Sequence, residues 1–100
     1  MAFNNSANRV TLKGWVASEL VSTTPYSVEF TIAVPRKVAQ GERNYPDFLT
    51  VYANKTDVCS FCKSYLKQNT PIVVRGEIRK FYGGDIKICS DDITVSTKRK

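Results

Sequence analysis

Residues 47–82 read DFLTVYANKTDVCSFCKSYLKQNTPIVVRGEIRKFY, and the period of their apolar residues changes twice. Over 47–53 apolar and polar positions alternate, as in a strand with one buried face. From Thr56 the apolar residues recur at helical spacing, and alternation returns over 72–82. The predicted order is therefore strand, helix, strand. The residues predicted on the buried stripe of the helix are Val58, Phe61, Cys62, Tyr65 and Leu66.

Both ends of this helix carry terminal signals. Thr56 or Asp57 is expected to cap the N-terminus, and Lys67 lies favourably near the negative end of the helix dipole. Asn69 is expected to adopt a left-handed conformation after the helix. Pro71 then prevents the helix from resuming.

Three more alternating segments flank this stretch. They are VTLKGWVAS over 10–18, VEFTIAVP over 28–35 and DIKICSDDITV over 85–95, with an irregularity expected near Asp91. Residues 36–46, RKVAQGERNYP, read as a long basic loop, and loops of this length are often functional. The inward positions are predicted to be Val10, Leu12, Gly14, Val16, Phe30, Ile32, Val34, Leu49, Val51, Ala53, Ile72, Val74, Gly76 and Ile78.

The predicted element order is β-β-β-α-β-β. Gly14 and Gly76 lie in the first and fourth strands, where a barrel has to bend sharply. Five strands with one helix between strands 3 and 4 is the arrangement of the oligonucleotide/oligosaccharide-binding (OB) fold, an all-β Greek-key barrel. One hundred residues make one domain. We expect a flexible N-terminus over 1–8, the barrel over 9–95 and a short basic tail over 96–100.

Composition excludes several classes of function. Fifteen Lys and Arg residues against nine Asp and Glu give a net charge of +6, which favours a polyanionic partner. The chain has no histidine and no glycine-rich phosphate loop, so neither an enzyme nor a cofactor is expected. Three cysteines argue against a disulfide framework, and no stretch reads as a signal peptide or a membrane span. We expect a cytoplasmic protein.

Cys59-x-x-Cys62 has the spacing of a metal or redox motif. Structural zinc requires about four ligands, and only Cys89 remains to supply another thiolate. The pair also begins three residues inside the predicted helix, whereas redox pairs lie at helix N-termini. Cys62 is therefore predicted to be a core residue, and no metal is expected.

Several segments resemble bacterial and phage single-stranded DNA-binding proteins (SSB). These are Asn8-Arg9-Val10-Thr11-Leu12-x-Gly14, then Phe30-Thr31-Ile32-Ala33-Val34, Asp47-Phe48, and Tyr65-Leu66-Lys67 leading into 72–79, IVVRGEIR. They follow the same order over residues 8–95. The resemblance implies an OB fold, binding to single-stranded DNA, and a homotetramer, with a dimer as the alternative.

Two departures from the SSB pattern qualify what the resemblance implies. Members of the family usually end in an acidic tip that recruits replication and repair enzymes, whereas this sequence ends in Lys98-Arg99-Lys100. This protein is therefore not expected to recruit replication or recombination proteins through such a tip. Ala53-Asn54-Lys55 stands where the family often has an aromatic residue. These departures favour a phage or mobile-element protein, acting in the cytoplasm of a bacterial host.

Binding to a single strand requires flat rings on which bases stack and cations that neutralise phosphates. If the inward sets fill the barrel, several aromatic residues face outward or lie near the hairpin Gly83-Gly84. The same rings would serve equally in a subunit interface or a second small core. Tyr26, beside Pro25, reads as a turn residue. The predicted stacking residues are Trp15, Phe48, Tyr52, Phe81 and Tyr82.

The predicted phosphate contacts come from the outer faces of strands one and four and from the long loop. Any single one of these cations can instead be an ordinary solvated charge. Lys55, Lys63 and Lys67, on or beside the helix, are interpreted as solubilising. The predicted contacts are Lys13, Arg36, Lys37, Arg43, Arg75, Arg79 and Lys80.

The predicted function is sequence-tolerant binding and protection of single-stranded DNA during replication, recombination or repair. An RNA-binding OB domain is one alternative, because the same face would accept either nucleic acid. A protein-interaction module of the primosome type is another, in which the barrel mainly docks a replication enzyme.

Overall fold

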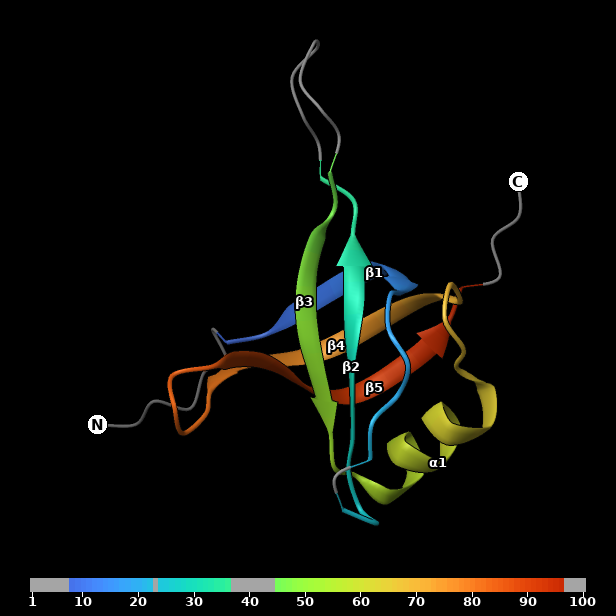
Figure 1. Cartoon of the computed structure of the whole chain (residues 1–100), viewed down its shortest axis with the longest axis vertical. Helices are drawn as coiled ribbons and strands as arrows, with labels where there is room; N and C mark the ends of the chain where they lie inside the picture. Colours follow the sequence, from blue (N-terminus) through green and yellow to red (C-terminus); the bar gives the residue numbers. More distant parts are fainter. Residues whose placement is uncertain (1–7, 23, 37–44, 97–100) are drawn as a thin grey trace, which may run out of the picture.

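The computed structural model describes residues 8–22, 24–36 and 45–96, and it forms a closed barrel with the strand order β1-β2-β3-β5-β4 (Figure 1). Helix α1, Thr56–Tyr65, connects β3 to β4 and lies at one end of the barrel. This confirms the predicted OB fold with its helix between strands 3 and 4. The strands are β1 Val10–Val16, β2 Val28–Val34, β3 Asp47–Ala53, β4 Pro71–Lys80 and β5 Ile86–Val95.

The inward phase of the strands is the predicted one over most of the barrel. Val16, Ile32, Val51, Ile72 and Val74 are all fully buried and form the centre of the core. A closed barrel buries one face of every strand, which is why alternation in the sequence identifies the core side chains. The core extends from the barrel interior to α1, whose buried residues belong to the same cluster.

Long antiparallel pairings link β2 with β3 and β4 with β5, whereas closure between β3 and β5 is short and parallel. Because only the C-terminal part of β3 pairs with β5, the β2–β3 and β4–β5 hairpins extend beyond the barrel (Figure 1). Leu49 and Ile78, both predicted to face inward, lie on these extensions and are 37% and 45% exposed. The prediction was wrong for these two residues because the barrel ends before their inner faces are covered.

The predicted irregularity near Asp91 is a β-bulge. Arg75 pairs with Asp92 and Gly76 pairs with Ser90, so Asp91 is the extra residue. A Cβ atom on Gly76 would lie 2.2 Å from the carbonyl oxygen of Cys89, so only glycine fits at this close approach. The bulge and the glycine together bend β4 and β5 at this point, as predicted for a barrel corner.

The segment before β1 is attached to the β4–β5 hairpin. The side-chain amide of Asn8 both donates to and accepts from the backbone of Ile78, at 2.9 Å each. Arg9 forms an ion pair of 3.1 Å with Asp91, and its hydrogen bond lowers the pKa of that carboxyl. Asn8, which the sequence assigned to the flexible N-terminus, is thus anchored to the barrel.

The helix differs from its prediction at both ends. Lys55 is the N-cap residue, in place of Thr56 or Asp57, and its side chain forms no capping hydrogen bond. The Asp57 carboxylate, inside the first turn, accepts a hydrogen bond of 2.9 Å from the Val58 N–H. Tyr65 was predicted on the buried stripe but is 63% exposed, because α1 ends there and the chain turns to an extended conformation at Leu66. Asn69 adopts the predicted left-handed conformation, with φ 76°.

Cys62 is fully buried, as predicted for a core residue, and burial raises the pKa of its thiol to about 12. Cys59 is also buried, and its thiol donates to the carbonyl oxygens of Ala53 and Tyr26, which joins α1 to β3 and to the turn before β2. Both thiols are therefore part of the packing. Within the described residues, no helix is long and apolar enough to span a membrane.

Candidate nucleic-acid interface

A row of three residues crosses the outer face of β1, β2 and β3. Trp15 is paired with Ala33, and Ala33 is paired with Phe48, so the two rings flank one small residue in register. Ala33 is fully buried although its position alternates outward, whereas Phe48 is 63% exposed. The register of three strands therefore brings two predicted stacking residues to one site.

Further along the outer face of β3, Tyr52 contacts Phe81 from the turn of the β4–β5 hairpin. The ring centroids are 5.4 Å apart and the planes meet at 72°, an edge-to-face arrangement. The ammonium of Lys87 lies 4.6 Å from the centroid of the Phe81 ring. The same ammonium is 3.2 Å from the carboxylate of Glu29. Phe81 is thus contacted from two strands, by Tyr52 of β3 and Lys87 of β5.

The predicted phosphate and stacking residues meet again at a cleft on the hairpin. The cleft has a volume of about 540 Å³ and is lined by Arg79, Lys80, Phe81, Tyr82 and Cys89. Tyr82 is fully exposed, next to the two positive-φ glycines of the turn. An exposed aromatic ring beside two cations is the combination expected of a surface that binds unpaired bases.

The predicted phosphate contacts divide into paired and unpaired cations. Three arginines form exposed ion pairs, whereas Lys13 and Lys80 are exposed and form none within the described residues. The pairs are Arg36 with Asp47 at 3.6 Å, Arg75 with Asp92 at 3.2 Å, and Arg79 with Glu77 at 2.8 Å. The predicted contacts Lys37 and Arg43 lie outside the described residues.

These ion pairs mean that a phosphate must compete with a carboxylate for each paired arginine. The hydrogen bond from Arg79 to Glu77 raises the pKa of the guanidinium, so Arg79 stays charged at any physiological pH. Exposed pairs of this kind are weak and screened by salt, so a phosphate competes with the carboxylate for the same guanidinium. Lys13 and Lys80 have no such competitor among the described residues.

Sequence reasoning missed Lys87, Glu29 and Cys89. The alternating pattern of β5 predicts that Lys87 and Cys89 face outward. It does not predict which residues they contact, because Lys87 lies 58 positions from Glu29 in the sequence. Tyr26 is 72% exposed in the turn before β2, where its backbone N–H donates to the hydroxyl of Thr24. It is thus a turn residue, the alternative that the sequence favoured.

Solved structures with the same fold include three similar over nearly their whole length. A small single-stranded DNA-binding protein from Streptomyces coelicolor is 22% identical, with a TM-score of 0.76, covering 96% of this chain and 100% of that chain. The dimeric N-terminal domain of PriB from Thermoanaerobacter tencongensis is 24% identical, with a TM-score of 0.72, covering 93% and 100%. A Plasmodium falciparum SSB, in complex with single-stranded DNA, is 16% identical, with a TM-score of 0.76, covering 95% and 99%.

At these identities the solved structures establish the fold. No curated protein sequence matches the chain. Family membership comes from the sequence comparison with family models, which matches residues 7–82. That match contains β1, β2, β3, α1 and β4 completely and ends before β5. The chain belongs to the Single-strand binding protein family, whose members are DNA-binding proteins and not enzymes.

Proposed function

We propose that this protein binds single-stranded DNA without sequence preference, by stacking bases on exposed rings and neutralising phosphates with Lys and Arg, and so protects single strands during replication, recombination or repair. The observation that carries the proposal is the outward exposure of Phe48 and Tyr82 on a barrel with a net charge of +6. Exposed rings contribute nothing to the core, and unpaired bases are the ligand that both features suit.

The proposed path runs from Trp15 and Phe48 along the outer face of β3 to Tyr52 and Phe81. Side chains on one face of a strand repeat about every 6.6–6.8 Å, so Phe48 and Tyr52 are separated by two such steps. Tyr82 extends this path at the hairpin turn. Phosphates along it would meet Lys13 and Lys80 directly, and would compete with carboxylates for Arg36, Arg75 and Arg79.

The proposal includes a homo-oligomer, a tetramer or a dimer. Leu49, Ile78 and Ile86 leave an apolar inner face exposed where the two hairpins extend beyond the barrel. A second copy covering these side chains would remove them from water. Sedimentation of the protein alone tests this part, since a monomer at all concentrations would exclude it.

The proposal extends to a phage or mobile-element protein in the cytoplasm of its bacterial host. Its low identity to the solved relatives supports a divergent origin. Replication or recombination proteins are proposed as partners.

The decisive experiment is titration of the protein with oligo-dT while the fluorescence of Trp15, the single tryptophan, is followed. Stacking on or beside this ring is expected to quench its emission, with saturation by single-stranded DNA at concentrations where duplex DNA of equal length has little effect. Matched RNA oligomers form a third arm, because a 2′-hydroxyl preference would assign the face to RNA. Equal binding of duplex and single strands would contradict the proposal.

The likeness to the PriB domain supports a second candidate, a protein-interaction module of the primosome type. This candidate predicts weak oligonucleotide binding and no effect of replacing Phe48. The same titration, repeated on Phe48→Ala, therefore separates the two candidates.

A further inference from the structure

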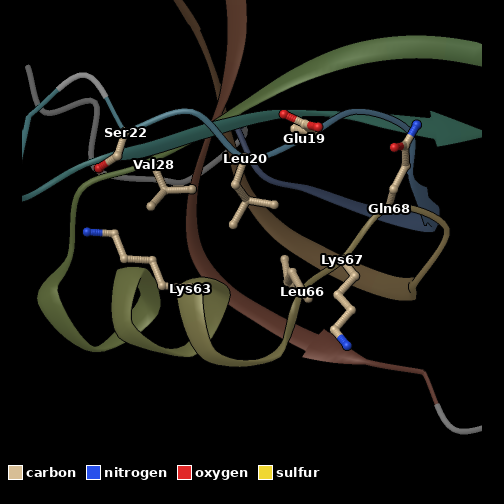
Figure 2. Close-up of a pocket in the computed structure, with 8 residues that line it drawn as sticks. All are labelled: Glu19, Leu20, Ser22, Val28, Lys63, Leu66, Lys67 and Gln68. Carbon is tan, nitrogen blue, oxygen red and sulfur yellow. The ribbon is translucent and has the colours of Figure 1, made fainter.

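A groove lies between α1 and the segment that links β1 to β2, and it contains none of the residues proposed to contact DNA (Figure 2). Its volume is about 430 Å³, within the range of about 300–1,000 Å³ that is usual for ligand sites. The residues that define its chemistry are Glu19, Leu20, Val28, Lys63, Leu66 and Lys67.

The interior of the groove is aliphatic. Val28 and Leu66 belong to the hydrophobic core, and Leu20 is half-buried against it. Figure 2 shows Leu20 and Val28 extending from one wall, with Leu66 on the other. A bulky apolar side chain entering here would bury its surface against these three residues, which favours binding.

One rim of this groove is basic. Lys63 lies in the last turn of α1 and Lys67 follows the helix, so both stand on the same side of the groove (Figure 2). Both side chains are exposed, and within the described residues neither has an acidic partner at ion-pair distance. Two unneutralised ammonium groups beside an aliphatic interior select an anionic ligand that also has an apolar part.

Two available occupants meet this requirement less well. Single-stranded DNA needs aromatic rings for stacking, and no aromatic residue lines the groove. In a second copy, the adjacent acids Asp91 and Asp92 are paired with arginines and would have to exchange those partners for the two lysines.

We propose that this groove binds an acidic peptide segment of a partner protein, with one bulky apolar side chain inserted between Leu20 and Leu66 and carboxylates facing Lys63 and Lys67. Glu19 stands on the opposite wall, on the segment that links β1 to β2 (Figure 2). Its carboxylate weakens the binding of an acidic ligand, so neutralising Glu19 strengthens it.

The test uses a short fluorescent peptide of aspartate and glutamate residues with one leucine at its centre, measured by anisotropy. Saturable binding to the unmodified protein is expected. Lys63→Gln combined with Lys67→Gln should weaken it roughly 3- to 30-fold, and Glu19→Gln should strengthen it about two- to fivefold. Replacing the central leucine by serine should weaken binding about tenfold or more.

Lys55→Gln is the matched control, because this exposed lysine precedes α1 and does not line the groove. It should leave peptide affinity unchanged. An equal loss of affinity in this variant would show that peptide binding depends only on the net charge of the protein, and it would overturn the proposal. Absence of saturable binding, or indifference to the central leucine, would overturn it as well.

The affinity of the Lys63/Lys67 double variant for oligo-dT separates this site from the DNA interface. Unchanged DNA affinity with weakened peptide binding supports an independent groove. If oligo-dT affinity falls with peptide affinity, and the two ligands compete, the groove belongs to the DNA path and the proposal fails. Failure of the protein to bind DNA at all leaves the peptide result intact.

Discussion

Phe48 and Trp15 illustrate how the register of three strands brings distant side chains together. Ala33 lies between the two residues in register across β2, and it is fully buried. A larger residue at Ala33 would have to displace its neighbours. The stacking proposed for this face therefore depends on three cross-strand neighbours.

Trp15→Ala combined with Phe48→Ala is expected to weaken oligo-dT binding by about 2–6 kcal/mol, since each stacked base contributes about 1–3 kcal/mol. Trp15 is lost as a probe in this variant, so the measurement is calorimetric. Thermal unfolding should change far less than the DNA affinity, because Phe48 is mostly exposed. Unchanged affinity would indicate that both rings belong to a subunit interface and not to the DNA-binding surface.

Lys87 positions Phe81 through its contact with the ring and its ion pair with Glu29. Lys87→Met keeps the aliphatic stem and removes the charge, and it is expected to weaken oligo-dT binding by about 0.5–1 kcal/mol. Lys87→Arg should restore most of the affinity, because a guanidinium also stacks on a ring. Lys55→Met is the control for loss of one charge, and an equal effect there would remove Lys87 from the positioning role.

Cys62 makes folding stability depend on alkaline pH. Its thiol has a folded pKa of about 12 against an ordinary value of 9.0, because burial disfavours the thiolate. The folded state is therefore stabilised fully below pH 9. That contribution is lost as pH rises from 9 towards 12, by up to about 1.4 kcal/mol per pH unit. Denaturant unfolding of Cys62→Ala, in reductant, should show a shallower decline over this range than the unmodified protein.

At the scale of elements, the two hairpins that extend beyond the barrel carry its exposed aromatic residues. Closure between β3 and β5 uses only Val51 and Tyr52 of β3 as paired residues. The rest of β3 pairs with β2 alone, and the end of the β4–β5 hairpin likewise projects past the barrel. This geometry exposes Phe48 and Tyr82 on projecting parts of the sheet instead of burying them.

Gly76 controls the bend from which the β4–β5 hairpin projects. Gly76→Ala would place a Cβ atom 2.2 Å from the Cys89 carbonyl oxygen and 2.8 Å from the Ser90 Cα atom, both rigid backbone atoms. We expect a loss of about 1–3 kcal/mol or more in the free energy of unfolding. Gly84→Ala is the comparison, since nothing lies within 4 Å and only its φ of +93° opposes the change. A smaller cost at Gly76 than at Gly84 would contradict the close approach.

For the whole molecule, the net charge of +6 predicts that DNA binding weakens with salt. The slope of log affinity against log salt is expected to be about −0.7 for each phosphate neutralised on a single strand. Lys13→Gln combined with Lys80→Gln should make the slope shallower by about 1.4, because both cations are unpaired within the described residues. Titrations at several salt concentrations measure this, and an unchanged slope would exclude both lysines as phosphate contacts.

The arginines make a contrasting contribution at the same scale. Arg75 and Arg79 are engaged by Asp92 and Glu77 in the absence of DNA. Each must exchange a carboxylate for a phosphate on binding, so their replacement should change the salt slope less than replacement of Lys13 or Lys80. The count of basic residues in the sequence therefore overstates the charge that is free to meet a strand.

The order of elements, the OB fold and most of the core were determined by the sequence alone, because period, burial and turn chemistry are local. Alternation placed Val51 and Val74 inside, helical spacing placed Cys62 in the core, and the irregularity at Asp91 marked the bulge. Only the tertiary structure decided that Leu49 and Ile78 are exposed, that Tyr52 meets Phe81, and that Lys87 reaches Glu29. Those outcomes depend on where the barrel closes and which distant residues are brought into register, and no local pattern carries that information.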